Sequence, residues 1–402
     1  MDQQHIIEQF PSLKRQVNGN DAIFLDGPAG TQVPQSVIDA ISHYYQTSNA
    51  NSHGLFATTQ ETDHLLDQTR AKVADFLGAE GPHCISWGAN MTTLNFSLSR
   101  AIGRALQPGD EVLITQLDHE ANRGPWLSLR ELGIVVREVK LNLDGRLNYT
   151  DFQAKINERT RLIAMGYASN IFGTVNEVEQ VRRWAHQVGA WLLLDAVHYA
   201  PHLPIDVQAI GCDFLLCSAY KFYGPHVGLL YSKPGLLDRL PTDRLRTAPQ
   251  AAPDSIETGT ANHAALAGVG ACIDFIAGLG SGATYREQLR SGMDYIGGIE
   301  RSNFAYFYEA LKALPGVQVY GPALSARRAP TISIVVKGRS AAELCTELGQ
   351  RGIFAWDGHF YAIRATEVLG LLEQGGVTRM GLAVYNTRAE LERVVQIIDQ
   401  LS

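Results

Sequence analysis

The chain has 402 residues, which is more than one compact core usually holds, so its length favours two domains. Its formal net charge is -7, whereas proteins that bind nucleic acid or anionic membranes usually carry a basic excess. No apolar run reaches the ~18 residues of a membrane span, and the N-terminus lacks a signal-peptide core. We therefore expect a cytoplasmic protein that binds neither nucleic acid nor membrane.

The five cysteines do not form a disulfide framework or a metal motif. They are Cys84, Cys212, Cys217, Cys272 and Cys345, and none belongs to a CxxC pair. Each lies in or beside an apolar stretch, which is typical of a small buried hydrophobic residue.

Short apolar runs alternate with helical patterns between about residues 60 and 235. The runs are EVLIT (111–115), IVVREV (134–139), RLIAMGYA (161–168), WLLLDA (191–196), FLLCSA (214–219) and VGLLYS (227–232). Residues 178–190 are one of the amphipathic helical stretches between them. This alternation predicts an α/β fold with a mainly parallel sheet covered by helices on both faces.

The rest of the chain predicts a second, smaller unit. Residues 233–262 have a loop-like composition, and a helical pattern follows over about 264–314. A strand at 331–336 and helices at 341–352 and 388–402 then indicate a smaller α+β unit. We predict a large domain over residues 21–283 and a small C-terminal domain over 284–402, with residues 1–20 packed against it.

An acid and a lysine follow two of the predicted strands. Asp195 ends the run WLLLDA, and Lys221 follows the run FLLCSA. Parallel sheets place their sites beyond the carboxyl ends of their strands. A pyridoxal enzyme needs such a pair: the lysine forms a Schiff base with the cofactor aldehyde, and the carboxylate keeps the pyridine nitrogen protonated. The alternative is a solvent-facing lysine and a helix-capping aspartate.

Other motifs are weaker. His198 and His202 have a spacing that metal ligands on a helix can have, but Pro201 lies between them and no HExxH glutamate is present, so we predict no metal site. The run GLGSGA (278–283) follows a helical pattern and favours a helix C-terminal turn over a phosphate loop.

The run SAYKFYGPHVGLLY (218–231) resembles the lysine segment of the group V aminotransferases, of the cysteine desulfurase and isopenicillin N epimerase type. The similarity extends from FLDGPAGTQVP (24–34) to RMGLAVYNT (379–387). It implies fold type I of the pyridoxal-phosphate enzymes, with a large domain built on a seven-stranded type of sheet, and pyridoxal 5'-phosphate as the cofactor.

The resemblance also implies the residues around the cofactor ring. Lys221 would form the Schiff base, and Asp195 would pair with the pyridine nitrogen. His198 would bond the phenolic oxygen. His119, in LDHEAN, would stack on the ring and move protons, and Asn170, in SNIFGT, would lie near the ring and the substrate carboxylate.

A second group would hold the phosphate. Ser218 matches a phosphate ligand, and Tyr220 stands where desulfurases often have a histidine. Ala89 and Asn90, in GANMTT (88–93), replace threonines common in the phosphate loop, so Asn90 and backbone N–H groups would bind phosphate at a helix start. Thr260 matches a threonine that reaches the neighbouring subunit's phosphate, which implies a homodimer.

The substrate side departs from the family pattern. Arg379 matches the arginine that binds the substrate α-carboxylate, for which its planar fork is suited. Desulfurases carry a mobile cysteine after a Gly-His pair. Here WDGHFYAIRATEVLG (356–370) has Tyr361 at that position and Trp356 where some desulfurases have arginine. We expect Tyr361, His359 and Arg364 to select the substrate.

Three classes of function follow from these residues. The first is C–S bond cleavage of a small amino acid, by β-elimination as in a C–S lyase or by desulfurase-type chemistry. The second is epimerisation, racemisation or transamination, which start from the same labile Cα–H bond. The third is an idle scaffold that binds a sulfur-carrier partner, and the retained Lys221, Asp195, His119 and Arg379 argue against it.

Overall fold

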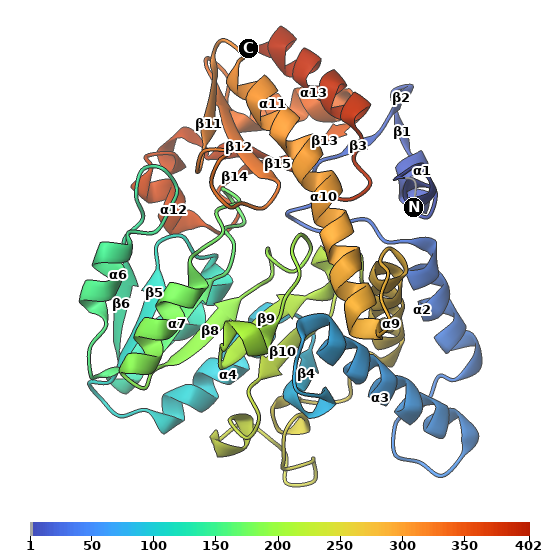
Figure 1. Cartoon of the computed structure of the whole chain (residues 1–402), viewed down its shortest axis with the longest axis vertical. Coiled ribbons are helices and arrows are strands. Elements are labelled where there is room, and N and C mark those ends of the chain that lie inside the picture. The colour runs from blue at the N-terminus through green and yellow to red at the C-terminus, as the bar shows by residue number, and fades with distance from the viewer. Residues whose placement is uncertain (1–2) are drawn as a thin grey trace.

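The computed structural model describes residues 3–402 and contains two main β-sheets (Figure 1). The larger sheet has seven strands in the order β4-β10-β9-β8-β7-β5-β6. These strands are β4 (Ile85–Gly88), β5 (Glu111–Thr115), β6 (Val135–Val139), β7 (Thr160–Gly166), β8 (Trp191–Asp195), β9 (Phe214–Ser218) and β10 (Gly228–Ser232). Only β10 runs antiparallel to its neighbours, so the predicted mainly parallel sheet is confirmed.

Helices cover both faces of this sheet because its strands are apolar on both sides. Leu193 of β8 packs in a cluster with Leu98 of α4, whereas Leu192 and Leu194 pack in the cluster on the opposite face with Val181 of α7. The helices of this part of the chain are α2 (Gln35–Thr47), α3 (Ala57–Leu77), α4 (Met91–Ala105), α5 (Gly124–Leu127), α6 (Tyr149–Lys155), α7 (Val178–Gln187), α8 (Val207–Ile210) and α9 (His263–Gly278).

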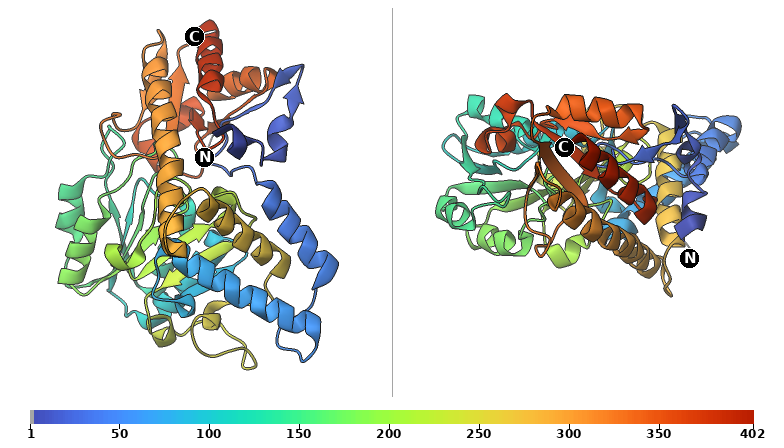
Figure 2. Two further views of the ribbon diagram at one scale, coloured as in Figure 1. Left: turned by 45° about the vertical axis from the view of Figure 1, so that its right-hand side comes forward. Right: turned by 90° about the horizontal axis from the view of Figure 1, so that it is seen from above.

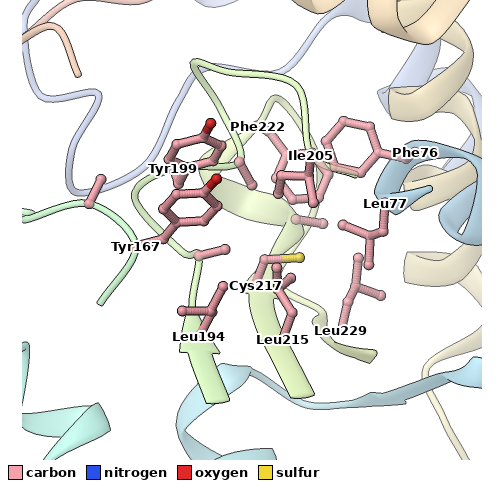
Figure 3. Close-up of a cluster of buried hydrophobic side chains, with 14 of the residues drawn as sticks. Phe76, Leu77, Tyr167, Leu194, Tyr199, Ile205, Leu215, Cys217, Phe222 and Leu229 are labelled. Carbon is pink, nitrogen blue, oxygen red and sulfur yellow. The ribbon is translucent and has the colours of Figure 1, made fainter. Parts of the chain in front are cut away.

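The core behind the carboxyl ends of β8 and β9 is rich in aromatic side chains (Figure 3). Tyr167 and Tyr199 stack with their ring centroids 3.6 Å apart. Phe222, directly after Lys221, packs on Phe76 of α3 with a centroid separation of 4.9 Å. Close packing of this kind resists displacement, so it fixes the backbone from which Asp195 and Lys221 project.

The second sheet is antiparallel and has the order β11-β12-β15-β14. Its strands are β11 (Val317–Tyr320), β12 (Thr331–Val336), β14 (Trp356–Gly358) and β15 (Val377–Gly381). Three helices belong to this region: α11 (Ala341–Gln350), α12 (Ile363–Val368) and α13 (Arg388–Leu401). The predicted strand at 331–336 has the same bounds as β12.

The N-terminal segment contacts this second sheet region. It contains α1 (Gln3–Ile7) and the strands β1 (Gln16–Val17), β2 (Asn20–Asp21) and β3 (Ile23–Phe24). β3 pairs in parallel with β13 (Ile353–Phe354), and the Gln3 amide donates to the Val384 carbonyl at 3.0 Å. Residues 1–2 of the segment predicted to pack here lie outside the described residues.

The helix α10 (Tyr285–Lys312) runs from the large sheet region to the small one (Figure 2). The helical pattern at 264–314 is therefore two helices, because α9 ends at Gly278 and α10 begins after Thr284, whose side chain forms a capping box with Glu287. The proposed domain boundary at residue 283 stays a prediction. Within residues 3–402, no helix is both long and apolar enough to cross a lipid bilayer.

Candidate active site

A cavity of about 320 Å³ opens between the carboxyl ends of the parallel strands and the small sheet. Ten of the residues predicted from the sequence to form the site line it: Asn90, His119, Asn170, Asp195, His198, Ser218, Tyr220, Lys221, Tyr361 and Arg379. Side chains far apart in the sequence thus meet in one place. Ala89, Thr260, His359 and Arg364 are not among its lining residues.

Lys221 lies in a short 3-10 turn directly after β9, beside the end of β8. Its ammonium group donates to the Pro28 carbonyl at 2.5 Å. Burial lowers the pKa of Lys221 to about 7, and the nearby Arg379 lowers it further, while Asp195 opposes the shift. A substantial neutral fraction of this amine is therefore available near pH 7, as a nucleophilic lysine requires.

Asp195 is the last residue of β8 and is 7% exposed. One carboxylate oxygen accepts the Val197 backbone N–H at 3.0 Å. Burial raises the pKa of Asp195 to about 6, whereas this hydrogen bond and the charge of Lys221 lower it. The carboxylate is therefore mostly ionised at pH 7 and can stabilise a positive group inside the cavity.

His119 is held in one orientation by its own loop. Its Nδ1 accepts the Ala121 backbone N–H at 3.0 Å. Burial lowers the pKa of His119 to about 4, and the charges of Lys221 and Arg379 contribute. The ring is therefore neutral near pH 7, with its hydrogen on Nε2, so it can stack on another ring or donate one hydrogen bond.

His198 connects the cavity to the small sheet. Its Nε2 lies 2.9 Å from Thr331 Oγ1 of β12, and its ring packs edge-on against His202 at 5.4 Å. His202 in turn lies 2.9 Å from Glu300 of α10. Burial and the neighbouring charges lower the pKa of His198 well below its usual value, so this ring is also neutral near pH 7.

The N-terminus of α4 forms another wall of the cavity. Asn90 caps the helix through its side-chain oxygen, which accepts the Thr93 N–H at 2.9 Å, and Ser218 Oγ accepts the Met91 N–H at 3.0 Å. Gly228 permits this close packing, since a Cβ there would lie 2.3 Å from the Asn90 carbonyl carbon. The positive end of a helix is suited to an anionic group.

Arg379 projects from β15 and is 4% exposed. It donates to the Asn170 carbonyl at 2.9 Å, and its guanidinium lies 4.0 Å above the Phe360 ring. Burial lowers the pKa of Arg379 to about 9, although Asp26 opposes this. Within residues 3–402 its Nε has no hydrogen-bond partner and no carboxylate lies within salt-bridge distance. This buried cation therefore has donors left for an anionic ligand.

The loop after β14 closes the cavity on the small-sheet side. The Tyr361 ring lies 5.3 Å from that of His119, and the Tyr361 carbonyl accepts the Glu120 N–H at 2.7 Å. His359 instead accepts the Tyr361 N–H at 3.1 Å, and Arg364 pairs with Glu138 at 2.9 Å. His359 and Arg364 therefore contact the loop and its surroundings rather than the cavity.

Ala89 and Thr260 are exposed and line a separate cavity of about 390 Å³. His226 lines the same cavity and stacks on Tyr220 with a centroid distance of 4.5 Å. Thr260 therefore does not join the other predicted phosphate ligands within one chain.

Several cavity residues were not among the predicted site residues, notably Asp118, Trp356 and Phe360. Asp118 accepts the Gly166 and Thr115 backbone N–H groups at 2.5 and 2.9 Å, and burial raises its pKa to about 7. Its place directly before His119 in LDHEAN was the available signal. For Trp356 and Phe360 the signal was their position around the Gly-His pair.

Comparison with known proteins gives a consistent result. The aminotransferase class-V family model matches residues 23–394. A cysteine desulfurase from Yersinia pseudotuberculosis serotype O:1b is 33% identical over 402 residues, covering 96% of this chain and 95% of the relative. The apo cysteine desulfurase structure from Thermococcus onnurineus NA1 has a TM-score of 0.86 and 27% identity, with 98% of each chain covered. The structure of the cysteine desulfurase CsdA from Escherichia coli also has a TM-score of 0.86 and is 26% identical. This match covers 100% of the present chain and 98% of the CsdA chain.

Proposed function

The chain belongs to the aminotransferase class-V family and is a pyridoxal-phosphate-dependent, cysteine desulfurase-like enzyme, and we propose that it cleaves the C–S bond of a small amino acid by β-elimination. The expected family, fold type I and cofactor are thereby confirmed. In the proposed reaction the Cα–H and Cβ–S bonds break. With one water, R–S–CH₂–CH(NH₃⁺)–COO⁻ gives RSH, pyruvate and ammonium, so atoms and charge balance.

The cavity fits pyridoxal phosphate. It combines a lysine with a pKa of about 7, a buried carboxylate at Asp195 and the positive end of α4. It also contains the unpaired Nε of Arg379, which suits the carboxylate of an amino acid. When bound, pyridoxal phosphate withdraws electrons from the substrate Cα and so weakens the bonds to that atom.

We assign the central steps to Lys221 and Asp195. Lys221 would bind the cofactor aldehyde as the neutral amine and then accept the Cα proton. Asp195 would hold the pyridine nitrogen in its protonated form. His119 and His198, both neutral, would respectively cover the ring and donate to its phenolic oxygen. The low pKa values of both histidines support these roles, because neither adds a positive charge beside Lys221.

The phosphate would lie at the start of α4, held by backbone N–H groups and by Asn90, Ser218 and Tyr220. We further propose a homodimer in which Thr260 reaches the partner's phosphate site. The exposure of Thr260 supports this proposal, since it does not line the cavity of its own chain.

The substrate carboxylate would bind to Arg379 and Asn170. Arg379 retains free donor capacity, and its carbonyl partner Asn170 fixes its position. A bidentate carboxylate–guanidinium pair orients the amino acid so that one bond at Cα faces the ring.

One observation favours elimination over desulfuration by persulfide formation: the cavity loop presents Tyr361 where the related desulfurases carry cysteine. Within the described residues, no cysteine lines the cavity, and four of the five are buried. Burial raises the pKa of Cys345, the remaining one, to about 12, which disfavours the thiolate needed for attack on sulfur.

The test is to incubate the holoenzyme with cysteine, cystine or a cysteine thioether and to quantify pyruvate, ammonium and alanine. We expect pyruvate and ammonium in equal amounts, with no protein-bound persulfide. The Lys221→Ala variant, with the same cofactor added, is the control and should release none. Alanine together with a persulfide on the protein would overturn the lyase proposal.

A further inference from the structure

Aromatic side chains from β14 and the loop that follows it form the outer wall of the cavity, and we infer that the enzyme selects cysteine thioethers whose sulfur substituent is apolar, preferably aromatic. This inference rests on the proposed function for the fate of the C–S bond, but the binding preference itself does not need that bond to break. The residues concerned are Trp356, Phe360 and Tyr361, which we call the aromatic rim.

Strand register places the first of them beside the proposed carboxylate site. Trp356 of β14 pairs directly with Arg379 of β15 in the antiparallel ladder. Side chains directly opposite each other in such a ladder lie on the same face of the sheet. An amino acid held by Arg379 therefore has Trp356 as its immediate neighbour.

The other two residues complete this wall from the loop that follows. The Phe360 ring lies 4.0 Å under the Arg379 guanidinium, and the Tyr361 ring lies 5.3 Å from His119. Trp356 is 50% exposed and Tyr361 is 64% exposed, so both keep apolar surface that no other part of the chain covers. A ligand substituent that packs on these faces would remove that surface from water.

The rim is held in place rather than loosely attached. The Asn170 amide donates to the Phe360 carbonyl at 2.9 Å, and the Glu120 N–H donates to the Tyr361 carbonyl at 2.7 Å. Phe360 and Tyr361 both adopt left-handed backbone conformations, with φ of 52° and 57°. Bulky residues rarely adopt such values, and the hydrogen bonds from Asn170 of the cavity and from Glu120, the neighbour of His119, hold the two residues there.

The rim also carries no charge at neutral pH. Asp357 and His359 belong to the same segment but do not line the cavity, and the charged groups that do line it have other partners or proposed roles. Asp118, for example, accepts two backbone N–H groups. A charged substituent, such as the second amino-acid half of cystine, would lose hydration against this wall without gaining a partner.

The experiment measures binding rather than turnover. We would titrate the holoenzyme with L-alanine, L-phenylalanine, L-glutamate and S-benzyl-L-cysteine and follow the absorbance of the bound cofactor. We expect phenylalanine and S-benzyl-cysteine to bind about tenfold more tightly than alanine, because one or two contacts between aromatic rings stabilise a complex by about that factor. Glutamate should bind no better than alanine. Equal affinity for phenylalanine and alanine would overturn the inference.

Variants of the rim locate the effect. Trp356→Ala should reduce the preference for phenylalanine over alanine to about a third or less, since it loses one aromatic contact, whereas Trp356→Phe should keep it. Leu143→Ala is the matched control, because Leu143 is an equally apolar but remote side chain that is 81% exposed. A preference unchanged in both Trp356 variants would contradict the assignment to the rim.

The same data separate this inference from the proposed function. If the aromatic ligands bind tightly but cysteine, cystine and S-benzyl-cysteine all yield no pyruvate, the rim assignment stands and the lyase proposal fails. If cysteine yields pyruvate while phenylalanine gains nothing over alanine, the lyase proposal stands and the rim assignment fails.

Discussion

The two walls of the cavity are built in different ways. The large-sheet wall places Asp195 and Lys221 on or directly after neighbouring buried strands, where packing on both faces fixes the backbone. The small-sheet wall places Trp356 and Tyr361 on a half-exposed edge strand and its loop, which hydrogen bonds hold in a left-handed conformation. The first wall suits a cofactor that must always be held identically, and the second suits a substrate side chain that can differ between related enzymes.

The largest effect should come from the large-sheet wall. Lys221→Ala removes the proposed nucleophile and proton carrier, so we expect turnover to fall by about 10³-fold or more. The cofactor absorbance band should no longer respond to amino acids as in the wild type. Activity above a tenth of the wild type would contradict the role of Lys221.

Glu300→Ala tests the buried contacts that connect the large-sheet wall to α10 and the small sheet. The substitution leaves the buried His202 ring, which lies behind His198, without its hydrogen-bond partner, and should lower the free energy of unfolding by about 1–3 kcal/mol. Chemical denaturation measures the change. Glu347→Ala breaks a half-exposed pair with Arg351 and serves as the control, with a loss below about 1 kcal/mol. An equal loss of unfolding free energy in the two variants would show that the buried His202–Glu300 contact stabilises the fold no more than an exposed pair does.

Asp195→Asn keeps the shape of the large-sheet wall but removes its charge. We expect kcat to fall by about 10²–10³-fold, the range seen when one preorganised electrostatic partner is lost. The dissociation constant of the cofactor should change less than kcat. If kcat remained near wild type, the pairing with the pyridine nitrogen would be wrong.

The pKa of Lys221 predicts how the apo-protein takes up the cofactor. Burial and Arg379 lower this pKa from 10.5 to about 7, and only the neutral amine attacks an aldehyde. The rate of covalent cofactor uptake should therefore rise between pH 5.5 and about 7 and level off above the pKa. Stopped-flow absorbance measures it. A rate still rising steeply between pH 8 and pH 10 would indicate an ordinary lysine.

The smallest effect should come from the anchor of the small-sheet wall. Arg364→Ala breaks partly exposed ion pairs with Glu138 and Glu367 and should change the free energy of unfolding by less than about 1 kcal/mol. Because it loosens the aromatic rim, it should raise KM with little change in kcat. A large loss of kcat would instead place Arg364 in the chemistry.

Much of the large-sheet wall could be predicted from the sequence. The buried strands are continuous apolar runs, and the polar residue that ends or follows each run marks the carboxyl edge of the sheet, where the site lies. The run EVLIT has the same bounds as β5. The short strand β4, ISWG, escaped prediction because four residues give little periodicity. The helical pattern at about 264–314 was read as continuous, although the run GLGSGA (278–283) indicated a helix C-terminal turn where α9 ends, and Thr284 and Glu287 form a capping box that is visible in the sequence.

The small-sheet wall could be predicted only in part. Tyr361 was found from its place after the Gly-His pair, but the roles of Trp356 and Phe360 depend on pairing with Arg379 and on hydrogen bonds to Asn170. Those contacts join segments distant in the sequence, and local patterns do not encode them. The role of Thr260 likewise depends on a second chain and stays a prediction.

Mass spectrometry of the borohydride-reduced holoenzyme tests the central assignment most directly. Reduction fixes the cofactor covalently to the amine that holds it, and digestion then identifies the modified peptide. We predict one cofactor per chain, attached to Lys221 in the segment SAYKFYGPHVGLLY. Attachment at another lysine, such as Lys233, or no attachment at all would contradict the site described for this enzyme.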